Sequence, residues 1–230
     1  MKPTVLKGAL MSALILSGAL AGGQAALADD GRRYEITIRN AMLGQPVAPS
    51  LFVTHDADFV MFEIGDAASD ELANMAETGN PGPLFGVVSV ADGVSDAVVL
   101  PFDRTPPVML PGESNSAEIS AEGDAKYFSA VGMLAATNDA FYAVRNVALP
   151  KQGSITVYAD AYDAGSEANT ELLADIPAGG NDALDDPAGG EEGYIHIHAG
   201  IHGVGTLDPE VHDWRNPVVE ITITRLSDHD

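Results

Sequence analysis

Three acidic residues lie in two short turns, each at the end of an apolar, strand-like segment. Asp163 and Glu167 are four residues apart, with Gly165 between them, and they follow the alternating segment 154–159. Asp139 lies upstream, in a second acidic turn between two apolar segments. Oxygen ligands on adjoining loops suit a hard cation such as Ca²⁺. The same residues also fit two ordinary surface turns, where Asp is common for backbone reasons.

Histidines form a second candidate cluster near the C-terminal end of the sequence. His196 and His198 point to the same face if they lie on a strand, because side chains alternate there, and His202 follows across a glycine. Neutral imidazoles at such a spacing bind Zn²⁺ or Cu²⁺. The alternative is that these rings lie on a solvated strand face or cap loops through hydrogen bonds.

Motifs for hydrolysis are missing. The sequence has no Gly-x-Ser-x-Gly, no His-Glu-x-x-His and no Cys nucleophile. Many acids are present, but nothing singles out two of them as a glycosidase pair. We therefore expect a protein that is not an enzyme, and a hydrolase with an unrecognised acid pair ranks last.

The first 28 residues have the pattern of a secretory signal peptide. Lys2 and Lys7 precede the apolar segment 8–21, and Ala26-Leu27-Ala28 provides a small-x-small cleavage site. The apolar segment is short for a membrane span. We expect an exported protein, periplasmic or extracellular, with no membrane span after cleavage and a single domain over residues 29–230.

The charge of the chain is strongly negative. It carries 11 Lys and Arg against 34 Asp and Glu, a net charge of −23. Two of those basic residues and none of the acids lie in 1–28, so the remainder has nine basic residues and a net charge of −25. Such a surface repels nucleic acid and anionic lipid and favours cations. Because there is no Cys, stability must come from the core, to which a bound metal would add.

Alternation of apolar and polar residues predicts an all-β protein, an antiparallel β-sandwich with one short helix near residues 67–78. Ser69 is the expected N-cap of that helix, and the segment 174–193, rich in Gly, Pro and acids, is expected to be a mobile loop. The first and last strands have similar patterns, which suggests that they pair. The expected strands are 34–39, 51–55, 86–90, 96–100, 116–120, 126–135, 141–148, 154–161, 194–198 and 217–225.

Four short sequence motifs resemble those of a known family: Tyr34–Asn40, Gly132–Asp139, Tyr162–Asn169 and His212–Pro217. With them the chain resembles the bacterial form of the spondin-type domain, named after the matrix protein F-spondin, from Tyr34 to about Arg225. The resemblance implies a sandwich similar to C2 domains.

In the animal members of that family, a Ca²⁺ is held by an Asp in a strand-end loop, by the Asp of an Asp-Ala-Gly-Thr word and by an acid four residues later. The resemblance carries these roles to Asp139, Asp163 and Glu167, where the last acid is Asp in the animal pattern. It implies a non-catalytic calcium-binding module for adhesion or ligand binding, with an extracellular ligand or surface as its unidentified partner.

Overall fold

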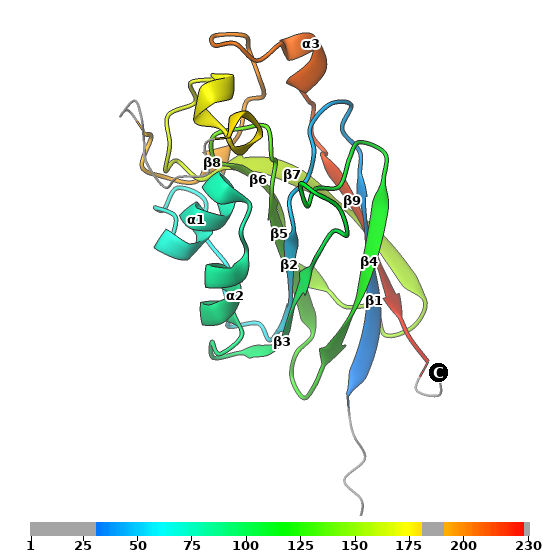
Figure 1. Cartoon of the computed structure of the whole chain (residues 1–230). Coiled ribbons are helices and arrows are strands. Elements are labelled where there is room, and N and C mark those ends of the chain that lie inside the picture. The colour runs from blue at the N-terminus through cyan, green and yellow to red at the C-terminus, as the bar shows by residue number, and fades with distance from the viewer. Residues whose placement is uncertain (1–30, 181–190, 228–230) are drawn as a thin grey trace, which may run out of the picture.

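The computed structural model describes residues 31–180 and 191–227, so the expected signal peptide and the centre of the expected loop 174–193 lie outside the described residues. Its strands are antiparallel and follow the order β3-β2-β5-β6-β7-β9-β1-β4, with β8 added beside β7 (Figure 1). The all-β fold expected from the sequence is confirmed. The strands are β1 (Arg32–Asn40), β2 (Ser50–His55), β3 (Val94–Leu100), β4 (Ser114–Ala121), β5 (Tyr127–Met133), β6 (Ala140–Ala148), β7 (Ser154–Asp163), β8 (His196–Ile197) and β9 (Val219–Arg225).

Strand β7 belongs to both layers of the sandwich. Its residues 154–159 pair with β9, and its residues 160–163 pair with β6. On the opposite side β3 and β4 approach each other, where Asp96 Oδ2 accepts a hydrogen bond of 2.8 Å from the Ser120 N–H. The sheet is therefore nearly closed. Strands β1 and β9 pair along their length, as the similar patterns of the two chain ends predicted.

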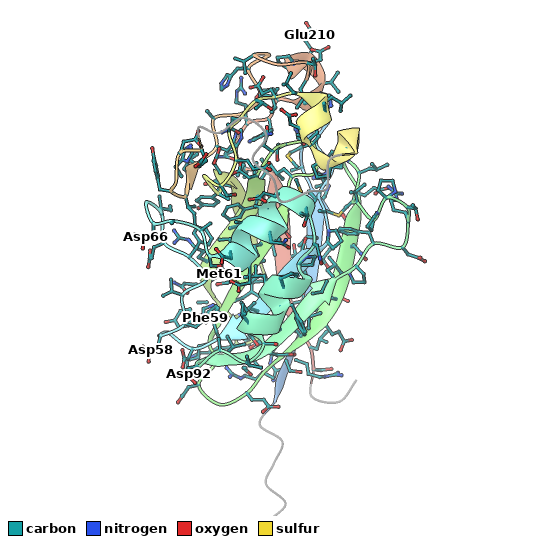
Figure 2. The ribbon with its side chains drawn as sticks, turned by 60° about the vertical axis from the view of Figure 1, so that its left-hand side comes forward. Asp58, Phe59, Met61, Asp66, Asp92 and Glu210 are labelled. Carbon is teal, nitrogen blue, oxygen red and sulfur yellow. The ribbon has the colours of Figure 1, made fainter. Side chains whose placement is uncertain are left out.

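Two apolar cores lie on either side of the layer that contains β2, β5 and β6. The inner core fills the sandwich and includes Ile36, Phe52 and Ile221. The outer core lies under the helices α1 (Asp70–Thr78) and α2 (Gly82–Val88), which lie side by side across that layer (Figure 2). All six residues of β2 are buried because both of its faces are covered.

Helix α1 confirms the expected helix and its cap. The Ser69 side chain accepts a hydrogen bond of 3.2 Å from the Leu72 N–H, which satisfies one of the free donors of the first turn. Gly79 ends the helix with φ of 69°, a left-handed conformation that suits glycine. Leu72, Met75 and Ala76 face the outer core.

The prediction of a strand over 86–90 is wrong, because this segment belongs to helix α2 and the turn after it. Pro83 stands in the first turn, where its missing N–H costs nothing. Leu84 and Val88 are buried four residues apart, which is a helical spacing, whereas Val90 is 81% exposed. Packing on the outer core therefore overrides the β-propensity of these valines.

Near the C-terminal end, the structure differs from the prediction in two other segments: a strand is shorter than expected, and part of a loop contains regular turns. The expected strand 194–198 is reduced to the two residues of β8. The first part of the expected loop 174–193 contains short 3-10 turns at Leu173–Asp175 and Pro177–Gly179, and Ile176 between them is fully buried. Helix α3 (Pro209–His212) completes the described elements. Within residues 31–180 and 191–227, no helix has the length and apolar character needed to cross a membrane.

A pair of substitutions tests the helical assignment of α2. Val88→Asp should lower the free energy of unfolding by about 3 kcal/mol or more, because it buries a charge, whereas Val90→Asp should change it by less than about 0.5 kcal/mol. In a strand both residues would face the same side. Urea unfolding of the two variants measures this, and similar losses in both would contradict the helix.

Candidate metal centre

The pairing of β6 with β7 brings the two acidic turns together. Ala140, the first residue of β6, is opposite Asp163, the last residue of β7, and the Ala164 N–H donates to the Asp139 carbonyl at 3.2 Å. The chain then turns at Gly165, which has φ of 67°. A Cβ at Gly165 would lie 2.4 Å from the Tyr194 carbonyl oxygen, so only glycine fits this turn.

Asp139 is fully buried, and its two carboxylate oxygens have different surroundings. Oδ2 accepts hydrogen bonds from the Ser166 N–H at 2.8 Å and from the Glu167 N–H at 3.0 Å. Oδ1 is buried without a hydrogen-bond donor among the described residues. An unpaired buried oxygen is costly, and native proteins rarely leave one without a water or an ion.

Burial, and then the charge of nearby Asp163, raise the pKa of Asp139 to about 7. The hydrogen bonds from Glu167 and Ser166 act in the opposite direction but are outweighed. In the metal-free protein Asp139 is therefore a mixture of protonated and charged forms near neutral pH. A bound cation would favour the charged form by replacing the missing donor.

Asp163 is 1% exposed, and both of its carboxylate oxygens accept hydrogen bonds. The Gly165 N–H donates to Oδ1 at 2.8 Å, and Asn169 Nδ2 donates to Oδ2 at 2.7 Å. Each oxygen keeps a second lone pair, so these contacts orient the carboxylate without occupying it fully. Sequence reasoning missed Asn169, because an amide in a turn gives no signal of its own.

His198 holds Asn169 in place. The Gly200 N–H donates to His198 Nδ1 at 3.0 Å, so the proton of the neutral ring lies on Nε2, which donates to Asn169 Oδ1 at 2.9 Å. Burial lowers the pKa of His198, although the charge of Asp163 opposes this shift. Its ring also packs against Trp214, with 5.0 Å between the ring centroids. Both ring nitrogens are thus engaged, and His198 is a positioning residue for Asn169.

The other two candidate histidines lie in different surroundings. His196 Nδ1 is 3.9 Å from Asp163 Oδ1. Asp163, Glu192 and His196 each offer a ligand atom, and these atoms lie within 4.8 Å of one another. His202 Nδ1 lies 3.8 Å from Glu171 Oε1, and its side chain is 61% exposed. The structure thus groups His196 with two carboxylates instead of with His198 and His202.

Glu167 and Glu171 are both buried, but their roles differ. Glu167 is 3% exposed, and its backbone N–H donates to Asp139, so the backbone of the third predicted acid lies at the site. Glu171 accepts hydrogen bonds from the N–H groups of His202 at 2.7 Å and Val204 at 2.8 Å. Its carboxylate therefore anchors the glycine-rich connection that follows β8.

The chain matches no model of a protein family, and no curated protein matches it. The spondin-type resemblance therefore stays a prediction from the sequence.

The donor chemistry suits two kinds of ion, and Asp163 belongs to both sets of candidate ligands. Asp139, Asp163 and Glu167 offer only oxygen, which suits Ca²⁺. Asp163, Glu192 and His196 offer one imidazole and two carboxylates, a set that suits Zn²⁺ and related transition metals. Glu192 was not a predicted ligand, because it is one of many acids in a loop that sequence spacing does not place near Asp163.

The raised pKa of Asp139 predicts how the stability of the metal-free protein depends on pH. Between the unfolded value of 3.8 and the folded value of about 7, the folded state holds a proton that the unfolded state releases. Stability should therefore fall as pH rises from about 4 to about 7 and level off above that range.

Thermal unfolding in EDTA across this pH range measures the effect. Asp139→Asn is the control, because an amide does not titrate, and its profile should be flatter than that of the unsubstituted protein. Two profiles of equal slope would show that Asp139 titrates near its ordinary pKa.

Proposed function

We propose that this protein is an exported, non-catalytic calcium-binding β-sandwich that acts as an adhesion or ligand-binding module. The observation that carries the proposal is the buried Asp139 carboxylate, whose Oδ1 has no hydrogen-bond donor among the described residues. The pairing of β6 with β7 puts this carboxylate beside the buried, charged Asp163. Export is the expectation of the signal-like N-terminus.

Calcium would act here as a structural ion. Without it, the charges of Asp139 and Asp163 repel each other, which is one cause of the raised pKa of Asp139. A cation between them would remove that repulsion and tie the turn before β6 to the turn after β7. Extracellular calcium modules bind with Kd of roughly 10⁻⁴–10⁻³ M.

The loops around this site supply the proposed contact surface. Several large apolar side chains on them are exposed, including Leu172, Tyr194 and Val204, at 38%, 46% and 74%. These side chains lie on segments adjoining the turns that calcium would hold. Loops on a rigid sandwich are frequent sites of recognition, so metal binding would order the surface that meets the ligand.

Asp139→Asn gives a sharp test of the calcium site. The amide oxygen can accept the hydrogen bonds from Ser166 and Glu167, while the NH₂ group takes the place of the unpaired oxygen and removes the repulsion with Asp163. In EDTA the variant should melt at the same temperature as the unsubstituted protein or higher. Calcium at ten times Kd should raise the melting temperature of the unsubstituted protein by about 3 to 6 °C, equivalent to about 1.4 kcal/mol, and that of the variant not at all.

Two further variants complete the calcium experiment. Asp163→Asn should also lose the response, although it should be less stable in EDTA because an NH₂ group would face a hydrogen-bond donor. Asp124→Asn, on the exposed β4–β5 turn, removes the same charge and should respond like the unsubstituted protein. A calcium response that survives Asp139→Asn would refute the site.

Transition-metal binding is the second candidate function, and the grouping of Asp163, Glu192 and His196 within 4.8 Å favours it. His196 is half-buried and Glu192 exposed, so an ion would enter from solvent. The ligands differ from the three histidines suggested by the sequence, because His198 is engaged by Asn169 and Gly200.

A zinc titration separates this candidate from calcium binding. His196→Ala and Glu192→Gln should each weaken Zn²⁺ binding about tenfold or more, as expected for the loss of one direct ligand, and leave the calcium response intact. His202→Ala is the matched control and should bind Zn²⁺ unchanged. Calorimetry at micromolar Zn²⁺ measures the affinities, and a loss with His202→Ala but not with His196→Ala would overturn the assignment.

A further inference from the structure

A cavity of about 400 Å³ lies between the two layers of the sandwich, at the end where β1 begins and β9 ends. Its lining comes from both layers, since β1 and β9 belong to one and β5 and β6 to the other. Asp139 precedes β6 and Leu149 follows it, so this cavity and the acidic turns lie at opposite ends of that strand. The lining residues are Arg32, Tyr34, Lys126, Tyr127, Ala148, Leu149, Lys151 and Arg225.

The cavity gathers positive charge in a strongly negative protein. Four of the nine basic residues after position 28 line it, although the net charge of that part of the chain is −25. Most carboxylates of the chain therefore have no basic partner, yet these four cations lie together. Ion pairing within the fold does not require such clustering, whereas an anionic ligand would.

Backbone carbonyls hold the Arg32 guanidinium at the cavity. It donates to the carbonyl oxygens of Gly123 at 3.0 Å and Ala125 at 2.6 Å, and these neutral acceptors orient the charge without cancelling it. Arg225 lies over the ring of Tyr34, 5.5 Å from the ring centroid. Two of the four cations are thus preorganised, which is what recognition of a carboxylate or phosphate requires.

The two lysines leave their charge available at the rim. Lys126 lies 3.5 Å from Asp124, but both side chains are well exposed, so solvent weakens this pair. Lys151 forms no ion pair with any residue in 31–180 or 191–227. Asp58 and Asp92 also lie towards the end of the molecule opposite Glu210 (Figure 2), but neither lines the cavity.

The walls of the cavity are apolar. Tyr34 and Leu149 are buried, at 1% and 9% exposure, and Tyr127 adds a half-exposed aromatic ring. A volume of about 400 Å³ falls in the range of small-molecule sites, roughly 300–1,000 Å³. Apolar walls below a cationic rim match a ligand with an apolar body and one acidic head.

We infer that this cavity binds a small organic anion with a single acidic head, an aliphatic or aromatic chain that ends in a carboxylate or a phosphate ester. The net charge of −25 excludes polyanions more strongly than monoanions, because the repulsion grows with the charge of the ligand. The inference does not depend on the metal centre at the other end of β6.

Calorimetry with three probes of equal chain length tests the inference. Octanoate and octyl phosphate carry the two acidic heads, and octanol is the neutral analogue. At least one of the two anions should bind with one-to-one stoichiometry and at least tenfold more tightly than octanol. The tighter of the two identifies the head group.

Charge variants locate the binding site. Lys126→Gln combined with Lys151→Gln should weaken the bound anion at least fivefold and leave the melting temperature unchanged, because both side chains are exposed. Arg32→Gln should weaken it as well. Arg215→Gln, whose side chain is 81% exposed and which does not line the cavity, removes one positive charge elsewhere and should have no effect.

Three results would overturn the inference: equal affinity for octanol, an unchanged affinity in the double lysine variant, or no saturable binding of either anion at millimolar concentrations. Asp139→Asn keeps this experiment separate from the calcium experiment. That variant should bind the anion normally, so failure of one proposal does not affect the other.

Discussion

Strand β7 changes its hydrogen-bonding partner halfway along its length, and the positions of both layers and of the acidic turns depend on that change. Its first six residues extend the layer of β9 and β1, and its last four extend the layer of β6 and β5. Small buried side chains, Ala159 and Ala161, lie where the strand passes from one layer to the other. The same pairing fixes Asp163 opposite Ala140 and therefore next to Asp139.

Two buried acids, Glu171 and Asp139, differ in their hydrogen bonds. Glu171 receives two backbone N–H groups, one on each oxygen, so its charge is compensated by the fold itself. Asp139 receives donors on Oδ2 alone, and its burial beside a second acid raises its pKa. The Asp139 carboxylate therefore still has an oxygen without a hydrogen-bond donor, and a bound ion or water would stabilise it more than it would stabilise Glu171.

Alternating patterns predicted most strands, because side chains that alternate between core and solvent leave that period in the sequence. They failed for α2, whose valines pack on an outer core that no local pattern reveals. For the site, short spacing placed Asp163 and Glu167 correctly in one turn. Glu192 and Asn169 were missed, since their contacts depend on β8 pairing with β7 and on the ring orientation of His198. Contacts between segments far apart in the sequence are what single-sequence reasoning lacks.

The antiparallel pairing of β1 with β9 determines how the molecule would be oriented if it were attached to a surface or to another domain. Tyr34 is opposite Arg225, so the first and last described strands enter and leave at the same end. The nine residues of β6 span about 26 Å between that end and the acidic turns, as eight steps of about 3.3 Å. A tether joined before β1 or after β9 would therefore attach at the end of the sandwich opposite the acidic turns. Those turns would then point away from the point of attachment.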